Sequence, residues 1–489
     1  LVLQTVEKPL CLTQIVEQWG LFTLKYYWVI YMLERPKNLR NNLQIVDLES
    51  LVPKNHLLRK IDAAIDFDRV YDFVEHLYSA DKGRPAVDPV MLVKIVLIQH
   101  LFGIRSLRQT VKEIEMNIAY RWFLGLDIVS PVPHFSTVSY AFATRFPSQV
   151  FEDIFAWILE EAVSRGFVDP SIIFIDSTHI KANANKKKAK KVLARKTARA
   201  YEQQLRKEIN EDRLKNGKKP IKDDDNNDDD NESNEGSDQT TSDTREVTVS
   251  TTDPDSGLFH KGEHKVVFAY SAHMACDRNN FILGLEVTPG NVHDSLVFDA
   301  VYNTVVERFP EAEIIAVDAA YKTPWICKKI IDDGRMPSTP YKRPAGKKGF
   351  FRPYEYVYDE YYNCVICPNN HVLTYSTTNK NGYREFKSDP NVCRACPDLA
   401  RCTTSRNHQK IVTKHIWESY VEQAEDFRHS PAGKASYALR GETIERIFAD
   451  AKEKHGMRYT FHRGLVRVLN WAKLKCAAMN LKKLALWAC

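Results

Sequence analysis

The sequence has little of what would make a disulfide-linked, membrane-spanning or repetitive protein. Ten cysteines in 489 residues are too few for a disulfide scaffold, and half of them fall between residues 364 and 402. No internal repeat is evident. The apolar stretch at 19–33 contains Lys25 and is too short to cross a bilayer. We therefore expect a reducing, cytoplasmic location and no contact with a membrane.

The net charge is also small, but the charges are unevenly distributed. A net charge of +6 is compatible with nucleic acid and by itself describes solubility and encounter, not function. Lysine and arginine crowd residues 181–219, and acids crowd residues 223–238. The pattern predicts a basic, helical arm followed by an acidic segment that has no apolar residue to bury and should be disordered.

The first half of the chain has a helical pattern. Position 1 is leucine, and residues 1–45 show no clear period, so we expect an upstream extension or an atypical start there. Further on, "DPVMLVKIVLIQHLFG" begins at Asp88 and Pro89, ends at Gly103, and has the broad apolar surface of a core helix.

Two shorter helices are predicted next. Ser106 with Gln109 three residues later indicates a capping box, and Ser136 is a candidate N-cap for a helix that carries Arg145. The pair is compatible with a helix-turn-helix that reads DNA, and equally with an ordinary helical bundle.

After Gly166 the pattern changes to strands. A turn at "DRNN" separates the second and third of five candidate strands, and a helix is expected near 294–308. The five strands are "SIIFID", "HKVVFAYSAHMACD", "FILGLEVTPGN", "AEIIAVD" and "MPSTPYK". This order predicts a mixed α/β core.

Three acidic positions have unusual settings. Asp176 ends the run "IIFI" and Asp318 ends "IIAV", so a buried strand would hold each carboxylate at its end. A lone carboxylate there is costly unless it is paired, although for either residue alone an acid facing solvent is the simpler interpretation. The third candidate lies in "GETIERIFADAKEKHG", where Glu442 and Glu445 adjoin a buried helical stripe.

Carboxylates on rigid elements suit a hard divalent cation. Magnesium prefers oxygen ligands and leaves positions open for water and phosphate oxygens. Two ions about 3.5–4 Å apart can activate the attacking oxygen and stabilise the leaving oxygen of a phosphodiester. The acids therefore predict nuclease or polynucleotidyl-transfer chemistry with Mg²⁺ or Mn²⁺.

At this point the sequence resembles a known family. The blocks "FIDSTHIKANANKKK", "AVDAAYKT" and "YALRGETIERIFADAKEKHG" resemble the three blocks of DDE transposases from bacterial insertion sequences. The helical stretch "GRPAVDPVMLVKIVLIQHLFGIRSLRQTVKEIEMNIAYRWFLGL" resembles their amino-terminal region. The likeness covers residues 46–489, is greatest to insertion-sequence family eleven-eighty-two, and implies an RNase H-like mixed sheet flanked by helices.

The resemblance implies a domain order and a set of site residues. Asp176, Asp318 and Glu445 match the catalytic, magnesium-binding acids. Glu442 stays the alternative, because four residues separate Arg440 from Glu445 where related groups have three. The expected parts are an extension (1–45), a helical DNA-binding domain (46–165), a first catalytic part (166–345) with a basic and acidic disordered insertion (182–262), a cysteine-rich insertion (346–429) and a second catalytic part (430–489).

Basic and aromatic residues would contact DNA. By resemblance, Tyr437, Arg440 and Lys452 would contact the transposon end, with ordinary helix-face pairing as the alternative. In "TPGNVHDS", His293 and Asp294 are expected to cap the next helix. The lysines that would lie along phosphates, unless they are a solvated charge run, are Lys186, Lys187, Lys188, Lys190 and Lys191.

The cysteine cluster indicates zinc. Cys364 with Cys367 and Cys393 with Cys396 form two C-x2-C pairs, and Cys402 is surplus. Two such pairs suit a closed, structural four-thiolate Zn²⁺ site. Reduced thiols without a metal are the alternative.

The resemblance implies a homodimeric transposase that acts on double-stranded DNA. It would bind the inverted-repeat ends of an insertion sequence, cleave there and transfer the strands into target DNA. A transposase-derived regulator that binds DNA without chemistry, and a metal-dependent nuclease without strand transfer, are the alternatives.

Overall fold

The computed structural model divides into two compact units, Leu1–Leu51 and Val52–Cys489. The first contains an antiparallel hairpin of β1 (Leu12–Gln18) and β2 (Leu21–Tyr27), followed by the short helix α1 (Leu48–Leu51). The residues that the structure describes are 12–18, 21–27, 46–79, 86–195, 201–221, 244–261, 265–343 and 347–488.

The second unit begins with helices, as predicted. The predicted core helix is α4, where the Asp88 carboxylate accepts the Val90 N–H and Gly103 adopts a φ of 64° just after the end. The helices are α2 (Leu57–Ala64), α3 (Arg69–Val74), α4 (Pro89–Leu101), α5 (Leu107–Met116), α6 (Ile118–Phe123), α7 (Phe135–Tyr140) and α8 (Ser148–Ser164).

The structure differs from the helical prediction in two details. Ser106 caps α5 by accepting the Gln109 N–H at 3.3 Å, but the Gln109 side chain donates to Glu113, so the capping box lacks its second half. The Ser136 cap is wrong: α7 starts two residues earlier than that cap would place it, because the His134 imidazole accepts the Ser136 N–H. Since α6 lies between α5 and α7, the two helices are not a consecutive helix-turn-helix pair.

The five predicted strands form one mixed sheet in the order β8–β7–β3–β9–β10. β3 pairs antiparallel with β7 and parallel with β9, and β7 pairs antiparallel with β8. A strand that sequence reasoning missed, β6, pairs with the start of β7. The bounds are β3 (Ile172–Lys181), β6 (Gly257–Lys261), β7 (Lys265–Cys276), β8 (Ile282–Pro289), β9 (Ile314–Val317) and β10 (Met336–Ser338).

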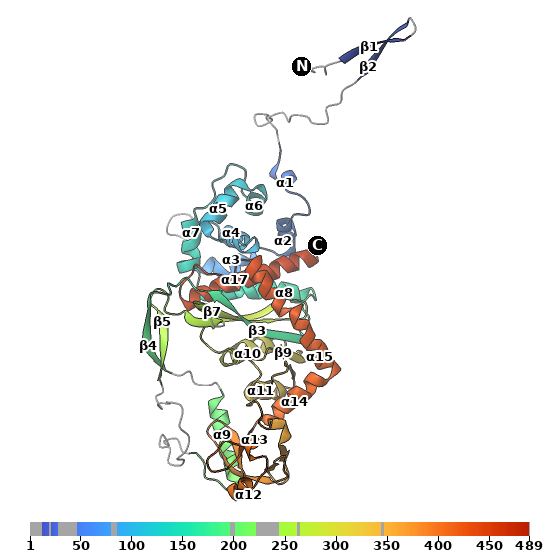
Figure 1. Ribbon diagram of the computed structural model, residues 1–489. Coiled ribbons are helices and arrows are strands. Elements are labelled where there is room, and N and C mark those ends of the chain that lie inside the picture. Colours follow the sequence, from blue (N-terminus) through green and yellow to red (C-terminus); the bar gives the residue numbers. More distant parts are fainter. Residues whose placement is uncertain are drawn as a thin grey trace. The chain divides into compact units, whose positions relative to one another are not determined.

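Helices cover both faces of this sheet (Figure 1). α8 and the C-terminal α17 (Leu465–Ala488) lie on one face, and α10 (Phe298–Arg308) and α11 (Pro324–Asp332) lie on the other. α17 also packs against α2 and α4, and one buried core runs from the N-terminal helices into the sheet. The fold is an RNase H-like α/β core with a helical N-terminal region built onto it.

The first insertion contains regular structure, so the prediction that 182–262 is disordered throughout is wrong. β4 (Ala189–Arg195) pairs antiparallel with β5 (Thr244–Ser250) where a helical arm was expected. The helical prediction holds for α9 (Glu202–Lys215). The acidic run at 223–238 lies outside the described residues.

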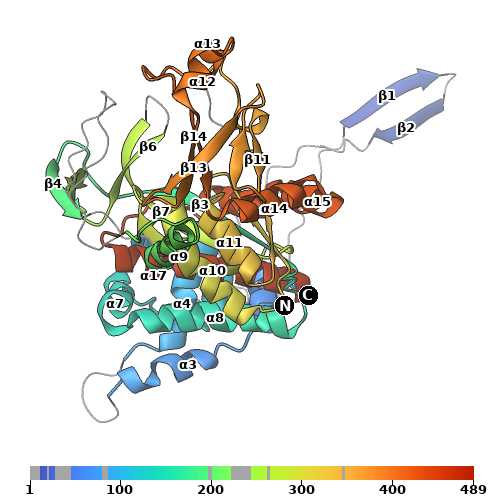
Figure 2. The ribbon, with the colours of Figure 1, turned by 90° about the horizontal axis from the view of Figure 1, so that it is seen from below.

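The cysteine-bearing insertion is an antiparallel sheet with two short helices (Figure 2). α14 (Glu418–His429) and α15 (Pro431–Ala438) lead the chain back to the core. The elements of the insertion are β11 (Val357–Asp359), β12 (Cys364–Ile366), β13 (Val372–Thr378), β14 (Tyr383–Lys387), α12 (Pro390–Arg394), α13 (Leu399–Cys402) and β15 (Ile411–His415).

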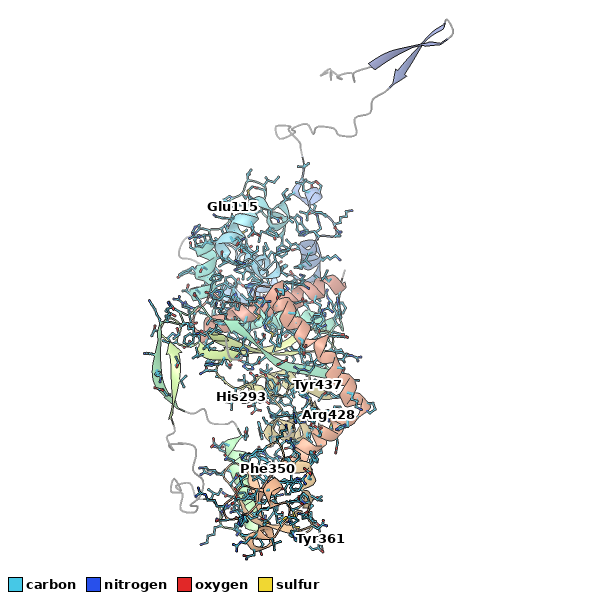
Figure 3. The ribbon with its side chains drawn as sticks, viewed as in Figure 1. Glu115, His293, Phe350, Tyr361, Arg428 and Tyr437 are labelled. Carbon is cyan, nitrogen blue, oxygen red and sulfur yellow. The ribbon has the colours of Figure 1, made fainter. Side chains whose placement is uncertain are left out.

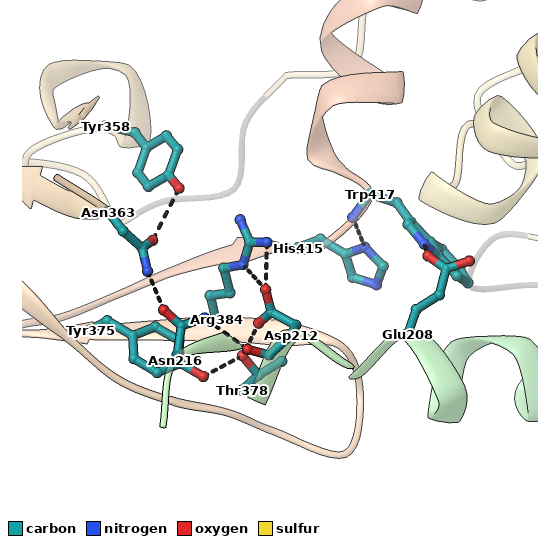
Figure 4. Close-up of polar contacts among 10 residues, drawn as sticks. All are labelled: Glu208, Asp212, Asn216, Tyr358, Asn363, Tyr375, Thr378, Arg384, His415 and Trp417. Carbon is teal, nitrogen blue, oxygen red and sulfur yellow. Dashed lines mark hydrogen bonds and ion pairs between the residues drawn. The ribbon is translucent and has the colours of Figure 1, made fainter. Parts of the chain in front are cut away.

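The two insertions are joined by α9 (Figure 4). The Arg384 guanidinium on β14 donates to the buried Asp212 carboxylate on α9 at 2.6 Å, and the Thr378 hydroxyl donates to the other carboxylate oxygen. Trp417 donates its indole N–H to Glu208. Among the described residues, no helix is long and apolar enough to cross a membrane.

Candidate active site

Asp176 and Asp318 follow residues that are paired across adjacent parallel strands. In the register of β3 and β9, Ile175 lies opposite Val317, and each of these residues is followed by an aspartate. Asp318 comes directly after β9, as predicted. The prediction that Asp176 ends its strand is wrong, because β3 continues to Lys181 by pairing with β7 along its other edge.

Arg440 neutralises the Asp176 carboxylate. Its Nη2 donates to Asp176 Oδ2 at 2.5 Å, and the two side chains are only 5% and 15% exposed. The Ser177 N–H donates to the other oxygen at 2.7 Å. Burial raises the pKa of Asp176 to about 6; Arg440 opposes this rise and the charge of Asp318 adds to it. The site thus contains a carboxylate whose negative charge needs a cation beside it.

The Asp318 carboxylate is held by the turn that follows β9. Its Oδ1 accepts the Ala320 N–H at 2.8 Å and the Tyr321 N–H at 3.3 Å. Tyr321 is buried, and the charges of Asp294, Asp176 and Asp318 add to the effect of burial in raising the pKa of its hydroxyl. Backbone donors therefore fix one oxygen of Asp318 within a group of acids.

Tyr437 lies near the end of α15 (Figure 3). Burial raises the pKa of the Tyr437 hydroxyl; Arg440 opposes the rise, and the charges of Asp318, Asp176 and Glu445 reinforce it. The guanidinium carbon of Arg440 lies 5.7 Å from the centre of the Tyr437 ring. The charges of all three candidate acids therefore act on this one hydroxyl.

The helix that carries Glu445 is α16 (Ile444–Glu453). Its buried residues are those of the predicted stripe, Ile444, Ile447, Phe448 and Ala451. Glu445 is exposed in the first turn, and Glu442, also exposed, precedes the helix. Lys452 is half-buried in the last turn. The stripe turns the Glu445 face of α16 outward while its other face packs on β3 and β7.

Sequence reasoning gave Asp294 only a capping role and so missed its position among the acids. His293 does cap, since its Nδ1 accepts the Ser295 N–H. Burial raises the pKa of Asp294; a hydrogen bond from the Ser177 side chain opposes this rise and Asp318 adds to it. The sequence did contain a signal for this position, because Asp294 follows soon after β8. The carboxyl end of β8 points the same way as those of β3 and β9.

A buried histidine lies behind Asp294. His273 Nδ1 is 3.7 Å from Asp294 Oδ1, and its Nε2 is 2.9 Å from the Thr288 hydroxyl. Burial lowers the pKa of His273 to about 4, and the charge of His179 lowers it further. His273 is therefore neutral at physiological pH and leaves the negative charge of Asp294 uncompensated.

The donor set fits a hard divalent cation in kind. Among the residues that the structure describes, no three His, Cys, Asp or Glu side chains are arranged to hold a metal ion. Asp176 and Asp318 nevertheless could supply oxygen ligands from adjacent strands, and burial makes the Asp176 charge costly without a cation. In the structure, Arg440 provides that positive charge.

The predicted DNA-contacting lysines are exposed. Lys186, Lys187 and Lys188 precede β4, and Lys190 and Lys191 lie on it. Lys191 Nζ pairs with Glu246 Oε2 on β5 at 2.8 Å. The antiparallel pair of β4 and β5 therefore presents this basic surface, where a helix was predicted.

The predicted zinc ligands are not gathered as a group of four. Cys364 is buried within β12, whereas Cys367 and the surplus Cys402 lie together against a small hydrophobic core. Cys393 is on α12, and Cys396 follows it in a turn. In the described part of the chain all the cysteines are free thiols.

Comparison with known protein families gives two matches. Residues 46–143 match the family described as a transposase domain (DUF772), and residues 366–485 match the family described as a transposase DDE domain. The second match contains Tyr437, Arg440 and Glu445, whereas Asp176 and Asp318 lie between the two matched stretches. A search of curated proteins found no match.

Proposed function

Because the two matches identify the chain as a DDE transposase of the insertion-sequence type, we propose that it moves its own element. It would bind the inverted-repeat ends as a homodimer, cleave the DNA with Mg²⁺ or Mn²⁺, and join the freed ends to target DNA. The matches name no particular insertion-sequence family. The proposal assigns 46–165 to DNA binding, 166–345 and 430–489 to catalysis, and 346–429 to an accessory insertion.

The observation that carries this proposal is the placement of Asp176 and Asp318 beside one another at the centre of the sheet. Their strands are parallel and in register, and burial has raised the pKa of Asp176 to about 6. Perturbed carboxylates that share a site are typical of functional sites. Asp176, Asp318 and Glu445 would hold the divalent ion. Asp294 lies close enough to them that the charge of Asp318 helps to raise its pKa.

The proposed reaction has two steps, hydrolysis and strand transfer. A water oxygen attacks phosphorus at the end of the element, the bond from phosphorus to the 3′ oxygen breaks, and a 3′-hydroxyl and a 5′-phosphate result. That hydroxyl oxygen then attacks phosphorus in a target phosphodiester: the new P–O bond forms, the bond from phosphorus to the target 3′ oxygen breaks, and a target 3′-hydroxyl leaves with the proton. A bound divalent ion supplies Lewis-acid activation of the attacking oxygen and neutralises charge on the phosphate.

Tyr437, Arg440 and Lys452 would bind the transposon end. If Arg440 exchanged its bond to Asp176 for one to a phosphate, the exchange would free the carboxylate for the metal ion. Lys186, Lys187 and Lys188 would contact phosphates further along the duplex, because they are exposed and close in sequence.

The test uses purified protein and a duplex that carries the repeats flanking its gene. We expect nicked and joined products that require Mg²⁺ and disappear in Asp318→Asn. Glu313→Gln is the matched control, because Glu313 is an exposed acid just before β9. It should leave both products unchanged.

The same assay separates the two other functions. Binding to the repeats without cleavage in Mg²⁺ or Mn²⁺ would identify a DNA-binding regulator. Cleavage that needs Asp318 but never yields joined DNA would identify a nuclease without strand transfer.

A further inference from the structure

The cysteine-bearing insertion has a small core for its size. Its sheet spans β11 to β15, but its core cluster contains only four buried residues, Tyr356, Val365, Leu373 and Phe386. A core of this size contributes little stability, and small modules usually add a disulfide or a metal ion. Since these thiols form no disulfide, a metal ion is the remaining way to cross-link and stabilise the module.

The geometry of β12 separates Cys364 from the other cysteines. Cys364 is paired with Asp359 on one side and Thr374 on the other, and it is 8% exposed. The next residue, Val365, belongs to the small core. Because successive side chains of a strand point to opposite faces, Cys364 faces away from that core.

Cys367 and Cys402 lie on the core face. Both pack against the cluster, and the Tyr356 hydroxyl lies 3.3 Å from Cys402 Sγ. Cys367 begins a tight turn in which the His371 N–H donates to Cys367 Sγ at 3.4 Å and Asn370 has a φ of 58°. This hydrogen bond fixes the position of the Cys367 sulfur within the turn.

Cys393 and Cys396 approach the same place from α12. The Asn369 side-chain amide donates to Cys396 Sγ at 3.0 Å, which connects Cys396 to the turn of Cys367. The Cys396 N–H donates to the Cys393 carbonyl at 3.1 Å, so the two residues form one turn. The Cys393 thiol donates to the Ser388 hydroxyl at 3.2 Å, the same hydroxyl accepts the Lys410 N–H, and the Lys410 ammonium donates to the Cys402 carbonyl at 3.0 Å.

We propose that Cys367, Cys393, Cys396 and Cys402 bind a structural Zn²⁺ ion as thiolates, and that Cys364 takes no part. Cys367 and Cys402 pack against the small core, Cys396 is hydrogen-bonded to the Cys367 turn, and Cys393 shares a turn with Cys396. No three of these sulfurs are arranged to hold an ion in the described structure, so their side chains must rotate inward on binding. Four thiolates leave no open position, so the site is structural.

Such an ion would also hold the surface on which α9 docks. Arg384 and Thr378, the partners of Asp212, lie on β14 and β13 of this module (Figure 4). The proposal does not rest on transposase activity, because metal content and thiolate ligation can be measured without DNA.

The test compares two serine variants of the full chain. By elemental analysis we expect about one zinc per chain in the wild type and in Cys364→Ser, and at least about three-fold less in Cys402→Ser. Circular dichroism of each variant reports its fold. Repeating the measurement in Asp318→Asn removes any contribution from an ion at the catalytic carboxylates.

Cobalt gives a second readout that does not depend on loss of metal. Co²⁺-loaded wild type and Cys364→Ser should show the same thiolate-to-cobalt charge-transfer absorption. Cys402→His should keep the ion with weaker charge transfer, because nitrogen replaces one sulfur. Wild-type protein with less than about 0.2 zinc per chain, zinc lost from Cys364→Ser but retained in Cys402→Ser, or an unchanged cobalt spectrum in Cys402→His would overturn the proposal.

Discussion

Arg440 and Asp176 form a buried ion pair next to a second carboxylate. The guanidinium is 5% exposed, and its Nη1 has no hydrogen-bond partner in the structure. A buried charge with an unused donor is costly, so the arrangement suits a residue that must exchange partners. Sequence reasoning found Asp176, Asp318 and Arg440 through motif spacing. It could not find that Arg440 bonds Asp176, because the two residues are 264 positions apart.

Removing Arg440 should affect both stability and chemistry. Arg440→Ala leaves the Asp176 carboxylate buried without a partner, so we expect a loss of about 3–5 kcal/mol in the free energy of unfolding. We also expect DNA cleavage to fall at least about 100-fold. Arg446→Ala, which removes an exposed arginine from α16, is the control for denaturant unfolding and for cleavage. Equal stability of the two variants would show that the pair contributes nothing.

At the scale of elements, α4, α16 and α17 meet around three buried bases. They are His100, His455 and Lys475, and the Lys475 ammonium donates to the His455 carbonyl. Burial is the first cause of every shift: it lowers the pKa of His455 to about 4, and that of Lys475 to about 7. The folded protein therefore binds fewer protons here than the unfolded chain.

This junction predicts acid sensitivity. A histidine whose pKa is lowered on folding contributes stability above about pH 6.5, and that contribution is lost as the pH falls from about 6.5 to about 4. His455→Phe should make the pH dependence of the free energy of unfolding shallower by about one proton across this window. His76→Phe, at an exposed histidine, should leave it unchanged. Denaturant titrations between these pH values measure the slope, and equal slopes would contradict the assignment.

Elements with strong local signals could be predicted, and their partners could not. Asp88, Pro89 and Gly103 marked α4 because caps act within one turn. A helix was predicted at β4 because its exposed, lysine-bearing residues show no buried alternation, so its strand form depends on pairing with β5, 55 residues away at Lys191 and Glu246. β6 is short, and its pairing with β7 defines it.

At the scale of the molecule, distant segments share one core. The C-terminal helix α17 packs on α2, α4 and α8, so the helices assigned to DNA binding are built onto the catalytic part. No local pattern in the sequence indicates this, because hydrophobic periodicity shows that a face is buried but not against what. The predicted boundary at residue 165 therefore separates two proposed functions and not two folding units, since one compact unit runs from Val52 to Cys489.

The lysines just before β4 should contribute to DNA binding by charge alone. Replacing Lys186, Lys187 and Lys188 by alanine should weaken binding equally for any sequence and reduce the slope of log affinity against log salt by about one unit per lost phosphate contact. Lys218→Ala with Lys219→Ala is the control, because both lysines are exposed and lie near the end of α9. An unchanged slope in the triple variant would rule out the contact.

The central claim is that Asp176 and Asp318 hold the divalent ion that cleaves DNA. The most direct measurement is cleavage by Asp318→Cys in Mg²⁺ and in Mn²⁺, because a thiolate is a poor ligand for magnesium and a better one for softer ions. We expect cleavage to be lost in Mg²⁺ and at least partly restored in Mn²⁺, while Asp318→Asn stays inactive in both. Full activity of Asp318→Cys in Mg²⁺, or of Asp318→Asn in either ion, would contradict the account.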